Sequence, residues 1–379
     1  MIIWIALLIP VITAIILYKK FAHQTVWWEF LIPFVVSILL IFLSKMSIET
    51  IQTQDTEYWG GCLTQADYYE AWNELVTYTE TYTDSKGRSQ TRTRTRVDYH
   101  PPQWKITDTN GCVISINQGT FESLCQRFGN RQFTDLRRNY HTNDGDLFTA
   151  RWNGSEATLM PVTTSHSYEN RVAVSDSVFH FPEVNPKDFG LVEYPKIQNY
   201  FQCNSIVGPG DASLPLAEQA LSCWNAKLGP QKQARIILVV FQNQPVQAGF
   251  DQESYWQGGN KNEFVITIGV DNSNNIVWCH PFSWTEVETL KVETREFVIS
   301  QKTLHLKNLV DWVAPQVSSN YVRKNFADFN YLSIEPPMWA VFLVFLLVSG
   351  VNLGLSMWIV HNEHQEFGAN QNRFGRAIS

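Results

Sequence analysis

Three stretches of the chain are almost wholly apolar. They run over residues 2–18, about 27–43 and 338–360, and Glu29 is the one charged residue within them. A bilayer core needs about 20 apolar residues, with about 17 to 25 tolerated. A buried helix of a soluble protein would normally keep a polar face, and these stretches have none. We therefore predict three transmembrane helices, two near the N-terminus and one near the C-terminus.

The residues that flank these stretches predict how the chain crosses the membrane. Lys19 and Lys20 follow the first stretch, whereas a cleaved signal peptide carries its positive charge before the apolar run. Short, positively charged loops stay in the cytoplasm. We therefore expect the large region between the second and third helices on the extracytoplasmic side of the cell membrane and the tail, 361–379, in the cytoplasm; Lys45 opposes this orientation. Tryptophans suited to the headgroup level flank the stretches: Trp4, Trp27, Trp28, Trp339 and Trp358.

Residues 46–200 carry the alternating pattern that is typical of β-strands. Thr alternates with Tyr or Glu over 75–83, a turn candidate follows at 84–87, and the alternation resumes over 89–99. Such a pattern around a glycine-containing turn predicts a β-hairpin. Three further elements are expected: a hairpin of 104–107 and 112–117 around Asn110-Gly111, a helix from a Thr120 cap to Gly129, and a turn at Asp144-Gly145 before a strand over 147–152.

The pattern changes to mixed α/β after a stretch rich in Pro, Gly, Asn and Asp, so we place a domain boundary near residue 200. The run over 234–241 is continuously apolar, which is typical of a strand buried on both faces. The other expected elements are a helix from Ser213 to about Lys227 ended by Leu228-Gly229-Pro230, strands over 263–270 and 276–282, and one or two helices in 304–331.

The predicted fold class is therefore a membrane-anchored α+β chain. Its parts are a transmembrane hairpin over 1–45, a β-rich extracytoplasmic domain over 46–200, an α/β domain over 201–335, a transmembrane helix over 336–360 and a cytoplasmic tail over 361–379.

A characteristic order of features lies within residues 212–332. It consists of Trp256, then Gly258-Gly259-Asn260-Lys261-Asn262, a strand ending in Gly269, and a helical close near Val313-Ala314-Pro315. This order resembles the TPM domain, an α/β domain of thylakoid-lumen proteins linked to photosystem repair and of bacterial membrane-anchored proteins. The resemblance implies the α/β fold, and in that family a phosphatase activity and metal binding. Trp278-Cys279-His280-Pro281 stands where a glycine-rich, acidic segment usually follows, so the activity is not carried over.

The first half resembles uncharacterised membrane proteins of bacteria and tailed phages, which names no activity. The segments that carry this resemblance are Glu57-Tyr58-Trp59-Gly60-Gly61 and Asp98-Tyr99-His100-Pro101-Pro102-Gln103-Trp104.

Cysteine usage and charge narrow the classes of function. An even number of cysteines on an oxidising side of a membrane permits three disulfides, in any of fifteen pairings, although several can simply be small buried side chains. The sequence has no CxxC motif, and the net charge of −7 argues against a nucleic-acid partner. The six cysteines are Cys62, Cys112, Cys125, Cys203, Cys223 and Cys279.

Arg92, Arg94 and Arg96 alternate with threonines, which predicts one row of guanidinium groups on a strand face. Such a row suits phosphate, lipid headgroups or an acidic partner. The alternative is an exposed hairpin whose charges discourage edge pairing.

Asp251, Glu253 and Asp271 lie on loops beside strand ends, where carboxylates can hold a hard cation such as calcium. The alternative is ordinary turn chemistry. The group Asn143, Asp144 and Asp146 lacks the spacing of a calcium loop and predicts a turn. No histidine pair has ligand spacing, and the sequence contains no Cys-His nucleophile signature; the histidines considered are His100, His141, His166, His180 and His280.

The third apolar stretch contains Gly350, Asn352 and Gly354. Glycines four residues apart let two helices approach closely, and an asparagine between them can bond across the contact. The partner is one of the first two helices or another copy of the chain.

Together these features predict a membrane-anchored extracytoplasmic interaction or accessory protein, which binds a protein partner or itself and no nucleic acid. The alternative is a metal-dependent envelope hydrolase or phosphatase of TPM-like type. A channel or transporter is disfavoured, because the apolar stretches carry no intramembrane charge.

Overall fold

The computed structural model describes residues 2–21, 27–129, 132–134, 147–151, 160–175 and 181–374. It is a mixed α+β chain that divides into two compact units. The first, called here the helical unit, comprises Met1–Asp55, Tyr168–His180 and Phe326–Ser379. The second, the globular unit, comprises Thr56–Ser167 and Phe181–Asn325.

The helical unit contains three helices that are long and apolar enough to cross a membrane. The prediction placed the ends of the second and third helices near 43 and 360, and both helices run further. Beyond the apolar stretch the second helix is supported by an ion pair one turn apart, Lys45 to Glu49 at 3.4 Å. The elements are η1 (Ile2–Leu7), α1 (Leu8–Phe21), α2 (Trp27–Thr53), η2 (Phe326–Phe329) and α9 (Met338–Phe374).

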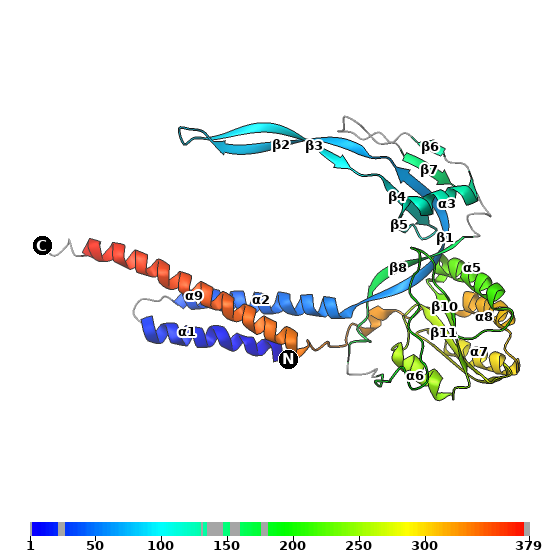
Figure 1. The fold of residues 1–379 in the computed structure, drawn as a ribbon. Coiled ribbons are helices and arrows are strands. Elements are labelled where there is room, and N and C mark those ends of the chain that lie inside the picture. Colours follow the sequence, from blue (N-terminus) through cyan, green and yellow to red (C-terminus); the bar gives the residue numbers. More distant parts are fainter. Residues whose placement is uncertain are drawn as a thin grey trace. The chain divides into compact units, whose positions relative to one another are not determined.

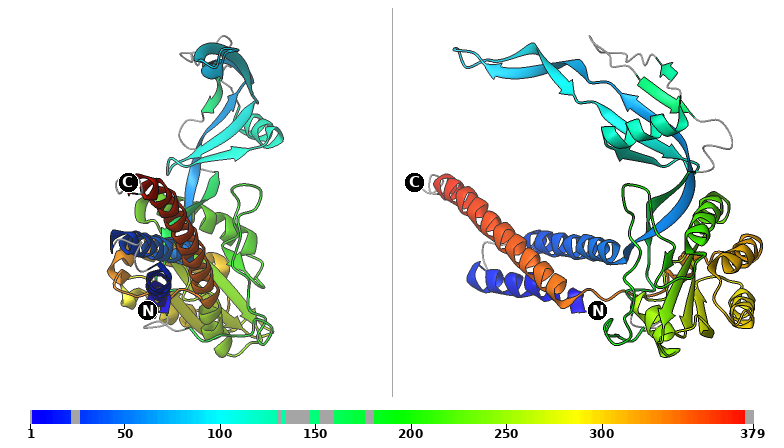
Figure 2. Two further views of the ribbon diagram at one scale, coloured as in Figure 1. Left: turned by 90° about the vertical axis from the view of Figure 1, so that its left-hand side faces the viewer. Right: turned by 45° about the vertical axis from the view of Figure 1, so that its right-hand side comes forward.

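The three long helices lie side by side (Figures 1 and 2). A small apolar core joins η1, α2 and α9, and many of the other large apolar side chains of these helices are exposed. The core residues are Ile3, Ala6, Ile41, Val344 and Val348.

Within the globular unit, residues 56–167 form most of a six-stranded antiparallel sheet with the order β5-β4-β1-β7-β6, and β8 also pairs with β1. The predicted second hairpin is confirmed as β4–β5. The expected cap of the following helix is corrected, because the side chain of Asn117 accepts the backbone N–H of Thr120 and the helix begins earlier. The Asp144-Gly145 turn lies outside the described residues. The elements are β1 (Gln54–Tyr69), β4 (Gln103–Asp108), β5 (Val113–Ile116), α3 (Gln118–Phe128), β6 (Gln132–Thr134), β7 (Leu147–Arg151) and β8 (Pro161–Glu169).

The first predicted hairpin is confirmed as β2 (Trp72–Thr83) and β3 (Ser89–His100), which pair without a break from Trp72 and His100 to Thr83 and Ser89. It forms a separate two-stranded sheet. Figure 2 shows it extending as a bare ribbon from the rest of the globular unit.

The second sheet of the globular unit has the order β12-β11-β10-β9, with β9, β10 and β11 parallel and β12 antiparallel. The predicted burial of the central strand is confirmed, because seven of its eight residues are buried. Helices α5, α7 and α8 cover one face and α6 the other (Figure 1). The elements are β9 (Ile206–Val207), α5 (Leu214–Lys232), β10 (Arg235–Gln242), α6 (Gln247–Tyr255), β11 (Glu263–Val270), β12 (Ile276–Ser283), α7 (Glu288–Ser300) and α8 (Leu306–Asn320).

The sequence predicts that helix α5 ends at Leu228-Gly229-Pro230, but the helix continues to Lys232. The glycine serves a packing contact instead of a helix end. A Cβ added at Gly229 would lie 1.7 Å from the carbonyl oxygen of Gly60, so strand β1 crosses the helix backbone to backbone at this point. The Gly60-Gly61 pair therefore allows β1 to join the two sheets.

Candidate functional site

The arginine row lies on one exposed face of β3, as the alternation predicts. Acidic side chains of the same hairpin neutralise part of the charge of these arginines. Nε of Arg92 lies 2.9 Å and Nε of Arg94 lies 2.7 Å from the same carboxylate oxygen of Glu80. Arg96 pairs with Asp98 on its own strand at 3.0 Å. One glutamate thus serves two arginines, and the segment from 84 to 96 carries five cations and one acid in a chain of net charge −7.

The opposite face of the hairpin carries hydroxyl groups. Threonines stand directly opposite each other across the two strands, in a ladder that no apolar core supports. Ser89 to Val97 are all exposed, and β2 contains no buried residue. The opposed pairs are Thr77–Thr95, Thr79–Thr93 and Thr81–Thr91.

The structure gives Asp251, Glu253 and Asp271 separate partners. Asp271 caps its own turn. The side-chain amide of Asn275 donates to its carboxylate at 2.9 Å, and the backbone N–H groups of Asn275 and Ser273 donate at 2.8 Å each. These bonds, the side-chain bond first, lower the pKa of Asp271. Asp251 accepts a bond from the side chain one turn earlier in α6. In the described part of the chain, no three His, Cys, Asp or Glu side chains are placed to hold a metal ion.

Glu253 pairs instead with His280, whose Nε2 lies 2.7 Å from the carboxylate. His100 pairs similarly with Glu74 at 2.8 Å and stacks on Trp72. His141 and His180 lie outside the described residues, as do Asn143, Asp144 and Asp146.

Asn352 packs helices within the chain. Its side chain is fully buried, and Nδ2 donates to Oγ of Ser37 on α2 at 2.7 Å. Gly350 and Gly354 take no part in this contact, because a Cβ added at either would meet nothing within 4 Å. Two helical positions differ by about 200°, so the glycines face away from the side that Asn352 presents.

All six cysteines are free thiols, and none of the permitted disulfides is formed. Cys125 and Cys279 are buried, in agreement with the alternative that several cysteines are small core side chains.

A buried ion pair lies at the junction between the two sheets. Arg235 and Glu263 begin the neighbouring strands β10 and β11, and both are almost completely buried. Burial raises the pKa of Glu263, and the guanidinium opposes that shift. The phenol of Tyr194 donates to the glutamate, while Nη2 of Arg235 donates to Sγ of Cys203 at 2.9 Å.

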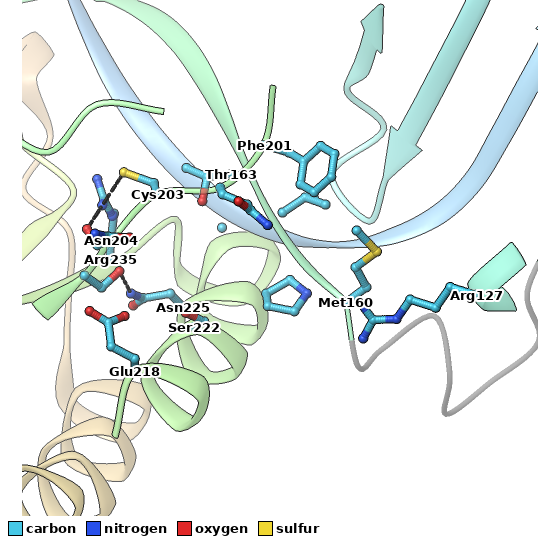
Figure 3. A pocket seen from close by; sticks show the side chains of 15 residues that line it. Arg127, Met160, Thr163, Phe201, Cys203, Asn204, Glu218, Ser222, Asn225 and Arg235 are labelled. Carbon is cyan, nitrogen blue, oxygen red and sulfur yellow. Dashed lines mark hydrogen bonds between the residues drawn. The ribbon is translucent and has the colours of Figure 1, made fainter. Parts of the chain in front are cut away.

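A cavity of about 280 Å³ lies beside this pair, between α5, β8 and the segment around Cys203 (Figure 3). Several of its polar groups are bonded to the protein. Glu218 accepts the backbone N–H of Ile206 at 3.1 Å, and Nδ2 of Asn225 donates to Oγ of Ser205 at 3.0 Å. These bonds make the cavity part of the polar core that joins the sheets.

A second cavity, of about 300 Å³, is lined by Cys112 and residues of β5 and β8. Sγ of Cys112 lies 3.6 Å from Nε2 of His166. The sequence contains no signal for this pair, because its members are 54 positions apart and only the pairing of strands brings them together.

Comparisons with protein-family models, curated proteins and solved structures find no match to this chain. The resemblance of residues 212–332 to the TPM domain therefore stays a prediction.

Proposed function

We propose that this chain is a membrane-anchored interaction protein whose copies join through the β2–β3 hairpin. Three apolar helices with mostly outward-facing apolar side chains support insertion in a bilayer. Lys19 and Lys20 support a cytoplasmic loop between the first two helices, which leaves the globular unit extracytoplasmic and the C-terminus cytoplasmic.

The observation that carries the proposal is the isolation of the hairpin. In the described part of the chain β2 and β3 pair only with each other, over twelve residues each, and neither face meets a core. An isolated two-stranded hairpin is marginally stable in water. Open strand edges are templates for further strands, so a partner that adds strands would stabilise this one.

The backbone groups that point outward can be identified from the turn. The N–H of Asp84 donates to the carbonyl of Arg88 at 2.9 Å. Opposite residues in an antiparallel ladder alternate between bonded and non-bonded pairs. The pair Glu80–Arg92 is therefore bonded, whereas Thr79 and Thr93 direct their N–H and C=O groups to the open edges.

The charges favour a second copy as the occupant of these edges. β3 carries the arginine row and β2 carries Glu74 and Glu80. Joining β3 of one copy to β3 of another opposes like charges, whereas joining it to β2 opposes unlike charges, as within the hairpin itself. Because β2 and β3 are antiparallel within each hairpin, a β3–β2 contact between copies whose hairpins point the same way is also antiparallel. Such a head-to-tail contact closes into a ring when a whole number of copies completes the rotation.

The test is the mass of the full chain in nanodiscs or mild detergent, measured by light scattering. We expect an oligomer for the natural chain. Thr93→Pro removes one outward N–H without removing a bond inside the hairpin, and we expect it to shift the mass toward the monomer. Thr93→Val is the matched control, because it keeps the N–H and should keep the oligomer. A monomeric natural chain, or equal masses for all three proteins, contradicts the proposal.

A further inference from the structure

Cys112 and His166 form a thiol–imidazole pair at the edge of the β-rich sheet. Besides the 3.6 Å approach of Sγ to Nε2, the hydroxyl of Thr164 lies 3.0 Å from the same nitrogen. The imidazole ring stacks on the indole of Trp59, with ring centroids 3.9 Å apart. Stacking holds the plane of the ring, and the hydroxyl of Thr164 holds Nε2 beside the thiol.

The thiol is held equally firmly by its backbone. The carboxylate of Asp108 accepts the N–H of Cys112 at 2.8 Å and that of Asn110 at 2.9 Å. Gly111 takes φ of 76°, which glycine allows at low cost. The turn between β4 and β5 therefore presents the side chain of Cys112 at a fixed position on the cavity wall.

The protonation states suit transfer of a proton from sulfur to nitrogen. Burial raises the pKa of Cys112, and the nearby carboxylate of Asp108 raises it further. Burial lowers the pKa of His166. At neutral pH both groups are consequently uncharged. In the tautomer with its proton on Nδ1, Nε2 of the imidazole accepts hydrogen bonds and can take the proton of the thiol.

The charged groups around the imidazole largely balance. Glu57 and Asp108 favour its protonated form and Arg323 opposes it. Glu57 is bonded to Arg323 at 2.7 Å, which limits its effect on the ring.

The cavity beside the thiol indicates what it accepts. It holds about 300 Å³, room for a small molecule, and its lining among the described residues contains no charged side chain. A neutral ligand with hydrogen-bonding oxygens fits such a wall. The hydroxyl side chains on it are Ser115, Thr163, Thr164, Ser165 and Tyr200.

We propose that Cys112 and His166 are a nucleophilic centre that accepts small acyl groups from uncharged esters. Sγ attacks the ester carbonyl carbon while its proton passes to Nε2 of His166. The C–O bond then breaks, and the imidazolium returns the proton to the departing oxygen, which leaves an alcohol and a thioester on Cys112. Attack by water releases a carboxylic acid and restores the thiol. This centre is independent of the assembly proposed above.

The test uses the full chain in detergent with p-nitrophenyl acetate as the probe. Mass spectrometry of peptides follows acetylation of Cys112 and of Cys223, a half-buried thiol on α5 for which the described residues provide no histidine partner. We expect Cys112 to react at least about tenfold faster, and His166→Gln to slow it by on the order of a hundredfold, as for removal of a general base. Cys223→Ser should leave acetylation of Cys112 unchanged. Equal reactivity of the two thiols in the natural chain overturns the proposal.

A pH profile of the natural chain gives a second test that needs no variant. With His166 as the base, the rate at Cys112 is nearly constant between pH 7 and 8, because both partners keep their protonation state there. A thiol that reacts only after ionising in solution gains about tenfold per pH unit below its pKa. A tenfold rise at Cys112 over this interval would show that the imidazole takes no part.

Discussion

At the scale of single residues, the junction of the two sheets depends on two glycines that the sequence does not mark as special. The sequence shows Gly60 as part of a glycine pair and predicts a helix end at Gly229. Neither pattern reveals that the two backbones touch, because a crossing of distant segments leaves no periodic signal. The structure leaves no room for a Cβ at either position, so only glycine fits.

Gly229→Ala tests this contact. The added Cβ would lie 1.7 Å from the carbonyl oxygen of Gly60, so β1 or α5 must move. Overpacking of this kind costs about 1–3 kcal/mol, and the helix preference of alanine returns up to about 1 kcal/mol. We expect a lower midpoint in thermal unfolding of the full chain. Gly119→Ala in α3 is the control, because its Cβ would meet only an ordinary contact at 3.7 Å, and it should be neutral or stabilising. Similar midpoints for both variants would show that the close approach carries no energetic weight.

At the scale of elements, predictability followed the strength of the local pattern. The β2–β3 hairpin was predicted almost to its ends, because alternation and turn chemistry specify it without help from the rest of the chain. The sequence does not predict helices α6 and α7, because most of their residues are polar and only a narrow side of each helix is buried. In α6 the buried residues are Ala248, Gly249 and Gln252. The acids expected on loops beside strand ends do not share a partner: Asp251 and Glu253 lie on helix α6, and Asp271 is bonded within its own turn. The Cys112–His166 pair shows the converse, because the sequence does not predict it and the fold brings its two members together.

The register of the hairpin can be tested by cross-linking. Thr79 and Thr93 stand opposite in a non-bonded pair, where side chains approach closely enough for a disulfide. We expect the chain with Thr79→Cys and Thr93→Cys to form this bond on mild oxidation, detected by mass spectrometry of peptides. In the chain with Thr79→Cys and Arg92→Cys the two side chains lie on opposite faces, and no bond should form. A bond in the second chain would mean that the strands pair one residue out of step.

At the scale of the whole molecule, a chain with three membrane spans has its two ends on opposite sides of the bilayer, whichever side the globular unit occupies. Two apolar helices precede the globular unit and α9 alone follows it. The proposed three spans would place the N-terminus on the same side of the membrane as the globular unit and the C-terminal tail on the opposite side. In the proposed orientation the positive loop at Lys19 and Lys20 is cytoplasmic. Intact cells that produce the chain with an epitope at each end should allow added protease to remove the globular unit and the N-terminal epitope, while the C-terminal epitope stays protected until the membrane is dissolved. Lys19→Glu with Lys20→Glu should weaken this preference and yield a mixture of orientations, because it removes the charges that retain the loop. If both epitopes are cleaved in intact cells carrying the natural sequence, α9 does not span the bilayer.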